Sequence, residues 1–507
     1  MNPLREGLTA ERVPEPQVMV IFGAGGDLSK RKLLPALYTL AHERLLPASF
    51  AVLGTARLDL DDKKFREDMR EACDRFARRR PVDAALWSGF GDNLFFEPGD
   101  FGDPKAYQAL AKRLEEIQTK LGLPANHLFY LSVPPSLFPL ILENLRAVGL
   151  ASRTMHPWPR IIVEKPFGHD LESARKLNSQ IKRVIRETQI YRIDHYLGKE
   201  TVQNMLAFRF GNGIFEPLWN SRYVENVQII AAEPIGMEGR GNYFEEAGIL
   251  RDMVQNHLFQ VLCLTAMEPP VSMEATAVRD EKVKLLKALR PIPPERMDDF
   301  VVRAQYSQGR VLGDSVVGYR EEPGVAQKST TETFVALKLF IDNWRWGNVP
   351  FFLRTAKRMP KKVTEISIHF RQPPHQLFGS NGHALSVPNV LAIRIQPDEG
   401  ISLHFGSKVP GPALDIAPVK MEFRYGTSFG QEPPEAYERL ILDAMLGDGT
   451  LFIRDDETEA SWQFISRIHE AWANQKKKEI PGYPAGNWGP VEAEALMDDT
   501  GMKWRNP

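Results

Sequence analysis

The hydrophobic residues of the first 200 positions form short, compact runs that are separated by stretches with helical spacing. Runs rich in branched or aromatic residues occur at 18–23, 50–54, 127–133 and 160–165. Between them, segments such as 33–43 and 104–122 repeat apolar residues every three or four positions. Strand–helix–strand alternation predicts a parallel sheet, and uninterrupted apolar strands agree because such sheets are buried on both faces. We therefore predict a Rossmann-like dinucleotide-binding domain over residues 18–200.

The pattern changes after about residue 200. Apolar and polar residues now alternate with a period of two at 224–233, 366–370, 391–396, 401–405 and 419–425. This alternation predicts antiparallel strands with one solvated face. A helical pattern at 244–266 interrupts the strands. The predicted fold class is thus α/β plus α+β, and residues 201–507 form a substrate-binding domain with a large, mainly antiparallel sheet.

Length and charge exclude several classes of protein. A chain of 507 residues is long enough for two large domains. The 64 Lys and Arg residues nearly balance the 65 Asp and Glu residues, so no global attraction to nucleic acid or to an anionic membrane is expected. Because no run of about 18 apolar residues occurs, we also expect no membrane-spanning helix.

Cysteine, histidine and arginine usage adds further expectations. The two cysteines, Cys73 and Cys263, lie far apart, which predicts no disulfide framework and a reducing, cytoplasmic location. The histidines form no HxxxH pair and no CxxC motif occurs, so we expect no metal site. Residues 1–17 lack the apolar core of a signal peptide and are predicted to be a flexible tail. The RRRP sequence at 78–81 is interpreted as a solvated helix end.

A glycine-rich turn, GAGGDLSKRK at 23–32, follows the first predicted strand. Glycines at a strand-to-helix turn let backbone N–H groups approach a pyrophosphate at the positive end of the helix. The spacing differs from G-x-G-x-x-G, because Gly23, Gly25 and Gly26 are followed directly by Asp27. A structural turn that binds no ligand is the alternative interpretation.

The end of the second predicted strand bears on the choice of cofactor. An acid there would bind a ribose 2′-hydroxyl and favour NAD, whereas this chain has Arg57, with Lys32 in the first helix. A cation near that ribose suits a 2′-phosphate, so we favour NADP and keep NAD as a weaker alternative. A solvated arginine after a strand is the structural interpretation of the same residue.

Polar residues gather where the two predicted domains meet. Lys165, held extended by Pro166, follows the strand at 160–165, and ligands bind at the carboxyl ends of such strands. RIDHYLGKE at 192–200 then precedes a helix that is predicted to start near Gly198. The amides of that helix start, together with the side chains of His195, Tyr196 and Lys199, would form an anion pocket. A His195 bonded to Asp194 for structural reasons is the alternative.

The helix at 248–260 carries a candidate base. Its apolar stripe predicts a core-facing side, and His257 lies next to the polar positions Asp252 and Asn256. A histidine whose pKa is raised by a carboxylate is a suitable general base near neutral pH. A satisfied core histidine is the alternative. Together with the nucleotide turn and the anion pocket, these residues predict an NADP-linked dehydrogenase of a phosphorylated alcohol.

Several motifs, in order, resemble the glucose-6-phosphate dehydrogenase family. They are GAGGDLSKRK, EKPFG at 164–168, RIDHYLGKE, EGRGNYF at 238–244, EEAGILRDMVQNHL, VPFFLRTAK at 349–357, IQPDE at 395–399, AYERLILDAMLGD at 436–448 and PAGNWGP at 484–490. The resemblance covers about residues 18–490. It implies oxidation of the C1 hydroxyl of D-glucose 6-phosphate to 6-phospho-D-glucono-1,5-lactone, the first oxidative step of the pentose phosphate pathway. It also implies a second domain that makes a dimer contact, in a homodimer or homotetramer.

The resemblance assigns a role to each matching residue. It makes His257 the general base, with Asp194 as its orienting carboxylate. It implies substrate binding by Lys165, His195, Tyr196, Lys199, Glu233, Asp252, Lys357, Lys362 and Gln396, with Lys361 as an alternative to Lys362. It implies cofactor binding by Gly23, Gly26, Asp27, Lys32, Arg57, Lys165 and Pro166.

Two other functions remain open at this stage. One is another NAD(P)-dependent sugar oxidoreductase, which would share the EKP turn but would not need the HYLGK residues. The other is a non-catalytic NADP or sugar-phosphate sensor, which would need no base and no orienting carboxylate.

Overall fold

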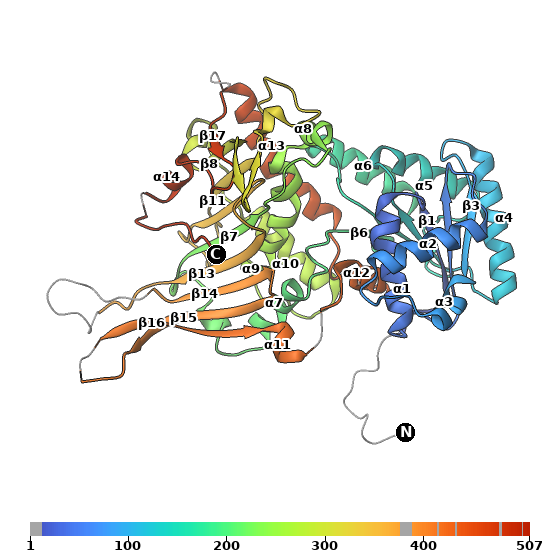
Figure 1. Cartoon of the computed structure of the whole chain (residues 1–507), viewed down its shortest axis with the longest axis horizontal. Coiled ribbons are helices and arrows are strands. Elements are labelled where there is room, and N and C mark those ends of the chain that lie inside the picture. The colour runs from blue at the N-terminus through green and yellow to red at the C-terminus, as the bar shows by residue number, and fades with distance from the viewer. Residues whose placement is uncertain (1–12, 376–387, 413–414, 431–432, 476–478, 499) are drawn as a thin grey trace.

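The structure is a computed structural model that describes residues 13–375, 388–412, 415–430, 433–475, 479–498 and 500–507. Figure 1 shows a first domain, in blue to cyan, beside a second domain that contains the rest of the chain. Among the described residues, no helix is both long and apolar enough to cross a bilayer. Both cysteines are free and buried.

Six parallel strands form the sheet of the first domain, in the order β3-β2-β1-β4-β5-β6. They are β1 (Gln17–Phe22), β2 (Phe50–Ala56), β3 (Leu94–Pro98), β4 (His127–Leu131), β5 (Pro159–Val163) and β6 (Ile190–Arg192). The sequence pattern missed β3 and β6, because β3 has only three consecutive buried apolar residues and β6 is only three residues long. The predicted Rossmann-like sheet is confirmed, and its strand order reverses between β1 and β4, where such sheets bind ligands.

Helices cover this sheet in two groups, as the alternation of the sequence predicts. α1 (Leu34–His42), α2 (Asp62–Phe76) and α3 (Ala84–Gly91) pack together, and so do α4 (Pro104–Leu121), α5 (Phe138–Ala147) and α6 (Leu171–Val184). The strands β1, β2, β4 and β5 are almost completely buried between them.

The last residues of the predicted N-terminal tail contact the first domain. Residues 1–12 lie outside the described residues, but Gln17 is the first residue of β1 and is fully buried. The Glu15 carboxylate accepts a hydrogen bond of 2.9 Å from the indole Nε1 of Trp158. Residues 15–17 of the predicted tail are therefore tied to the first domain.

Nine strands form the sheet of the second domain, in the order β16-β15-β14-β13-β7-β12-β11-β8-β17. They are β7 (Val224–Ala232), β8 (Val301–Ser307), β11 (Phe334–Leu339), β12 (Phe351–Ala356), β13 (Val363–Phe370), β14 (Val390–Gln396), β15 (Gly400–Lys408), β16 (Ile416–Arg424) and β17 (Gly482–Pro484). All neighbours are antiparallel except β7 with β12 and β8 with β17, so the predicted fold class is confirmed. β9 (Gly309–Val311) and β10 (Asp314–Val316) form a separate hairpin.

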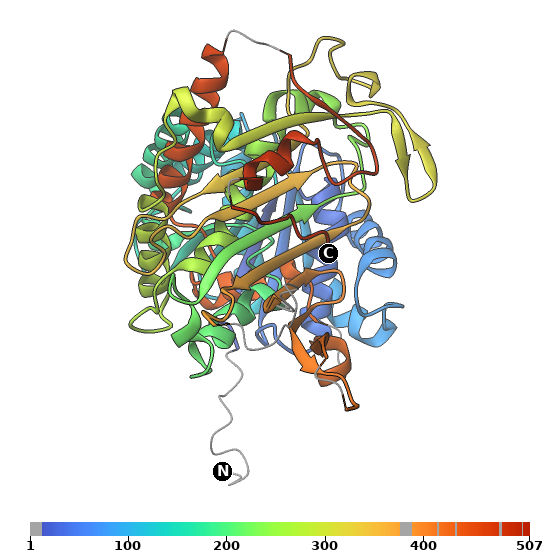
Figure 2. The same ribbon diagram turned by 90° about the vertical axis from the view of Figure 1, so that its left-hand side faces the viewer.

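Helices separate this sheet from the first domain. They include α7 (Glu200–Phe210), α8 (Gly241–Ile249), a π-helix at Leu250–Leu258, α9 (Phe259–Ala266), α10 (Ala275–Lys287), α12 (Ala436–Leu446) and α13 (Asp455–Asn474). α7, α9 and α10 lie on the side that faces the first domain in Figure 1, whereas in Figure 2 the strands lie in front of the helices. The short helices α11 (Tyr425–Phe429) and α14 (Glu492–Asp498) lie after β16 and near the C-terminus.

The two domains are joined by ion pairs at buried positions. The interpretation of residues 78–81 as a solvated helix end is wrong for Arg78, whose side chain is only 9% exposed. Its guanidinium binds Glu43 at the end of α1 at 2.7 Å and Glu438 in α12 at 2.8 Å. An arginine on a helix end is usually solvated, but here α12 of the second domain covers it and supplies a carboxylate.

Candidate active site

The glycine-rich turn lies at the carboxyl edge of the parallel sheet, as predicted. Gly23 has a φ of +84°, and a Cβ there would lie 2.3 Å from the carbonyl oxygen of Ser132, which follows β4. Only glycine fits both the backbone conformation and this close approach. The Gly26 N–H donates to the carbonyl oxygen of Gly23 at 3.0 Å, which closes the turn just before the first helical residues. The turn thus has the backbone shape that lets a pyrophosphate come close.

The predicted cofactor cations have different neighbours. Arg57 is exposed directly after β2, and the neighbouring Leu58 approaches Gly25, so Arg57 lies beside the glycine turn. Lys32 instead faces α12 and forms an ion pair of 2.8 Å with Glu435. Asp27 lies 3.7 Å from Arg31. The structure therefore puts Arg57, rather than Lys32, at the end of the second strand, where a 2′-phosphate is expected.

Strand register in the second domain brings together Glu233 and Lys357, which lie 124 positions apart in the sequence. β7 and β12 are parallel, with Ala232 opposite Ala356, so the next residue of each strand lies at the same edge of the sheet. The Lys357 ammonium donates to the Glu233 carboxylate. The adjacent pair of β13 and β14 places Thr364 opposite Gln396 at this edge.

A π-helix carries the predicted base. Gly248 has a φ of +65°, and a Cβ there would lie 2.4 Å from the Glu332 carboxylate. Glu332 accepts hydrogen bonds from the backbone N–H groups of Ile249 and Leu250 at 3.0 and 3.1 Å, so it caps the start of the π-helix. The predicted single helix at 244–266 is thus interrupted, and an i→i+5 ladder brings Asp252 and His257 onto adjacent turns.

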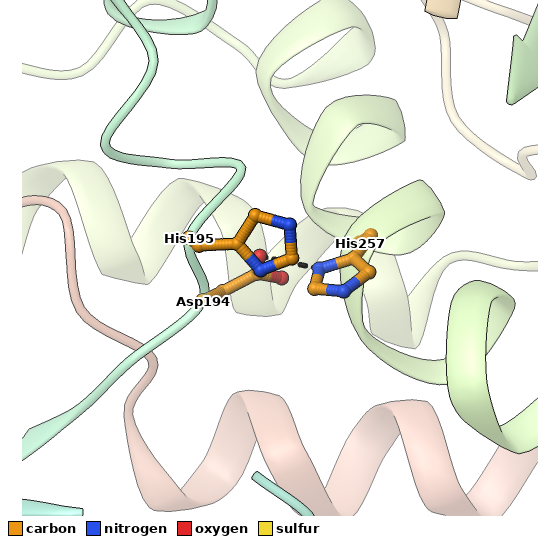
Figure 3. Close-up of side chains that lie close together, drawn as sticks. All are labelled: Asp194, His195 and His257. Carbon is orange, nitrogen blue, oxygen red and sulfur yellow. Dashed lines mark hydrogen bonds and ion pairs between the residues drawn. The ribbon is translucent and has the colours of Figure 1, made fainter. Parts of the chain in front are cut away.

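His257 is held between a carboxylate and an ammonium group. Its Nδ1 lies 2.5 Å from Asp194 Oδ1, and its Nε2 lies 2.9 Å from the Lys165 ammonium. Lys165 also donates to the side chain of Asp252 at 3.2 Å. Figure 3 shows Asp194 reaching His257 from the segment before α7, with His195 beside the pair. This network assigns the proton to Nδ1, and it leaves Nε2 as the acceptor.

The pKa of His257 corrects one expectation. We predicted that the carboxylate would raise it, but burial lowers the pKa of His257 and outweighs the opposing effect of Asp194. Burial alone would raise the pKa of Asp194, and the adjacent His257 lowers it well below its usual range. The pair is therefore a carboxylate and a neutral imidazole, which is the state that a general base needs.

The same residues offer the donor types of a metal site, although the sequence predicted none. Ligand atoms of Asp194, His195 and His257 lie within 4.8 Å of one another. However, Asp194 Oδ1 is engaged by the Nδ1 of His257, and the Lys165 ammonium lies against the Nε2 of the same ring. A cation next to this ammonium would be repelled, so the arrangement suits proton transfer better than metal binding.

The anion pocket predicted from RIDHYLGKE is buried between the domains. The ring of Tyr196 stacks on His257 with centroids 4.5 Å apart, and the Lys199 ammonium lies 4.6 Å from the centre of the Tyr196 ring. Lys199 precedes α7 and donates to the Gln396 side chain, whose Nε2 donates to Thr364 Oγ1 at 2.9 Å. These contacts connect the segment to the sheet edge of the second domain.

Burial and nearby cations determine the charge of this pocket. Burial lowers the pKa of His195 well below its usual range, so His195 offers an N–H group rather than a positive charge. Burial and the charge of Lys362 lower the pKa of Lys199 to about 8. Lys362 therefore lies close enough to act on Lys199, which favours Lys362 over Lys361 as the second basic residue of the pocket.

Sequence reasoning missed Thr364, Glu332 and Glu164. Thr364 bonds Gln396 and Glu332 caps the π-helix, while Glu164 accepts hydrogen bonds from the hydroxyl groups of Tyr130 and Tyr437. Glu164 is the first residue of the EKPFG motif, so this motif could have indicated it as a site residue. The other two are single polar residues outside the quoted motifs, and no local pattern separates them from other polar residues.

Comparisons with known proteins agree with this geometry. Residues 20–204 match the family model for the NAD binding domain of glucose-6-phosphate dehydrogenase, and residues 206–505 match the model for its C-terminal domain. The chain is 47% identical to a glucose-6-phosphate 1-dehydrogenase of Chlamydia muridarum, with 100% of both chains covered. It is 45% identical to glucose-6-phosphate 1-dehydrogenase 2 of Mycobacterium tuberculosis, over 100% of this chain and 98% of that protein.

Solved structures give the same result. A glucose-6-phosphate dehydrogenase in complex with its substrate glucose-6-phosphate has a TM-score of 0.88 at 36% identity, covering 98% of this chain and 100% of that one. The glucose-6-phosphate 1-dehydrogenase of Mycobacterium avium has a TM-score of 0.82, also at 36% identity, covering 98% and 99%. The matches confirm the resemblance seen in the motifs, and the chain belongs to the glucose-6-phosphate dehydrogenase family.

Proposed function

We propose that this chain oxidises the C1 hydroxyl of D-glucose 6-phosphate to 6-phospho-D-glucono-1,5-lactone, with NADP as the cofactor. The observation that carries the proposal is the pairing of His257 with Asp194 beside the cationic pocket around Lys199. One segment of nine residues supplies both the orienting carboxylate and the phosphate-binding side chains. The distance between the proton acceptor and the bound phosphate is therefore limited by a short stretch of backbone.

The neutral imidazole of His257 accepts the proton of the C1 hydroxyl at Nε2. Asp194 holds Nδ1–H at 2.5 Å and stabilises the imidazolium that forms. In the free protein the Lys165 ammonium already donates to Nε2 at 2.9 Å, so the substrate hydroxyl must replace it. Lys165 then remains beside Asp252, from which it can donate to the sugar oxygen.

The remaining site residues hold the two ends of the substrate. His195, Tyr196, Lys199 and Lys362 bind the phosphate, with Gln396 as a neighbour of Lys199. Lys165, Asp252, Glu233 and Lys357 bind the sugar hydroxyl groups, since they form two ion pairs, one across the domain junction and one within the second domain, that can exchange partners. This geometry favours a phosphorylated sugar over the neutral sugar of another oxidoreductase, and the base favours an enzyme over a sensor.

The glycine turn provides the fit for NADP. The absence of a Cβ at Gly23 and the exposed guanidinium of Arg57 suit a pyrophosphate and a 2′-phosphate, respectively. Gly23, Gly26, Asp27, Lys32 and Arg57 would hold the nucleotide, and Lys165 with Pro166 would border its nicotinamide end. When bound, NADP supplies the hydride acceptor for C1.

The initial rate of NADP reduction, followed at 340 nm, tests this function. We expect efficient turnover of glucose 6-phosphate with NADP, lower efficiency with NAD, and poor use of glucose. The reason is that glucose leaves the partly buried ammonium of Lys199 without an anion. Comparable kcat/KM values for glucose and glucose 6-phosphate would contradict the phosphate pocket and favour the other sugar oxidoreductases.

We further propose a cytoplasmic homodimer, with a homotetramer as the alternative, that uses the outer end of the large sheet, on the face of β15 and β16 that carries Leu403 and Met421. Met421 on β16 is 62% exposed, and a cavity of about 730 Å³ nearby has apolar walls that include Leu403 and Phe405. A large apolar patch beside such a cavity is typical of an interface. Met421→Glu should convert the oligomer to monomers in analytical ultracentrifugation, and an unchanged mass would exclude this face.

A further inference from the structure

Each of the three basic residues after the glycine turn forms an ion pair with a carboxylate. Lys30 lies 3.9 Å from Asp68, Arg31 lies 3.7 Å from Asp27, and Lys32 lies 2.8 Å from Glu435. The first two acids belong to the first domain. Glu435 belongs to the second domain, 403 positions away, and forms the shortest of these pairs. Lys32 is therefore held by a carboxylate that only the meeting of the two domains supplies.

Lys32 and Glu435 face a solvent-accessible cavity rather than a packed core. The cavity has a volume of about 820 Å³, and its described lining includes Arg75 and Arg80 in addition to Lys32. The side chains of Lys32 and Glu435 are 42% and 44% exposed. An anion that enters this cavity can thus reach the Lys32 ammonium, provided that it displaces the Glu435 carboxylate.

The backbone that carries Glu435 is anchored by the residues that follow it. Glu438, one turn further on, is only 2% exposed and is bound by Arg78 at 2.8 Å. Ala436 lies against Gly198 so closely that a Cβ on Gly198 would be 2.6 Å from the Ala436 carbonyl oxygen. Because these contacts fix the backbone, release of Lys32 requires only a rotation of the Glu435 side chain.

We propose that Glu435 is an affinity-determining residue for the cofactor, because it competes with a cofactor phosphate for Lys32. This inference rests on the proposed function, in which Lys32 binds NADP. In the free protein the carboxylate neutralises Lys32, and on binding the phosphate takes its place. The ion pair is partly exposed, so its loss is a small cost that reduces affinity without preventing binding.

Glu435→Gln tests the competition, because it removes the charge and keeps the shape. We expect the Kd for NADP, measured by isothermal titration calorimetry, to fall by about two- to fivefold, as suits an exposed ion pair. Asp342→Asn is the matched control, since the Arg290–Asp342 pair is 2.7 Å long and its side chains are 43% and 51% exposed. The control should leave the Kd unchanged. An unchanged or weaker Kd for Glu435→Gln would overturn the proposal.

Lys32→Met and the double variant separate competition from a general change in charge. Lys32→Met should weaken the binding of NADP. In the double variant, Glu435→Gln should no longer improve the affinity for NADP. A gain that persists without Lys32 would overturn the competition. If Lys32→Met binds NADP normally, Lys32 does not bind the cofactor and the inference about Glu435 fails. The proposed function is tested separately, by NADP binding and turnover of the wild-type protein. If Glu435→Gln tightens the binding of NADP but not of NAD, the 2′-phosphate is the competing group. If it tightens the binding of both cofactors, the competing group is the pyrophosphate, which both contain.

Discussion

His257→Ala should lower kcat by about 10²–10⁴-fold and leave the Kd for glucose 6-phosphate within a few-fold of wild type. The imidazole is the proposed proton acceptor, whereas Lys199, Lys357 and their neighbours would still hold the substrate. Single-turnover rates and calorimetric Kd values separate the two effects. Because burial lowers the pKa of His257, kcat/KM of the wild type should rise with pH along a limb that lies below the ordinary histidine value of about 6.5.

His127→Asn is the matched control for this variant. His127 is also a buried histidine with a side-chain partner, Gln118 at 3.0 Å, but it begins β4 at the amino edge of the parallel sheet. Its replacement should leave kcat within about twofold, because ligands bind at the opposite, carboxyl edge. If His257→Ala retains turnover, His257 is not the general base. The alternative interpretation, a core histidine whose hydrogen bonds are structural, would then be favoured.

Lys199→Met should raise KM for glucose 6-phosphate by about 10- to 100-fold, the size of one charge-assisted hydrogen bond, with kcat little changed. Methionine keeps the length and the apolar stem of lysine and removes the ammonium. Weak turnover of glucose should be the same in both proteins, because glucose carries no phosphate. An equal loss for glucose and glucose 6-phosphate would mean that Lys199 supports the site without binding the phosphate.

The pH dependence provides a second measurement for Lys199. Its pKa is lowered to about 8, so the ammonium is present below that pH and is lost as the pH rises through it. Phosphate binding should weaken accordingly, and kcat/KM of the wild type should fall above about pH 8. Lys199→Met should lack this alkaline limb while keeping the acid limb of His257. An alkaline limb that is unchanged in the variant would assign it to another group.

Much of the architecture could be predicted from local pattern. Strands buried on both faces are continuous apolar runs, and strands buried on one face alternate apolar and polar residues. The parallel sheet and the antiparallel sheet could therefore both be predicted from these patterns. The glycine turn was also predictable, because only glycine fits at Gly23. β3 and β6 were not, since their apolar runs are of three residues or fewer and the strands are defined by pairing with β2 and β5.

The active site was predictable in part. The EKPFG and RIDHYLGKE motifs indicated Lys165 and Lys199, because each is a short polar segment at the end of a strand or the start of a helix. The link between Glu233 and Lys357 could not be predicted from spacing, since it follows from the parallel register of β7 and β12. The choice between Lys361 and Lys362 likewise depended on which side chain lies near Lys199.

By itself the sequence determined which chemical groups are present and which local structures carry them: a glycine turn, a lysine after a strand, a histidine in a helix and a cluster of phosphate-binding side chains. Only the tertiary structure decided how they act together. The π-helix brings Asp252 and His257 onto adjacent turns, and the packing of the domains brings Asp194 to His257 across 63 positions. The same burial removes water from His257 and lowers its pKa, whereas the sequence suggested only the carboxylate that would raise it. Desolvation depends on everything packed around a group, and no local pattern contains that information.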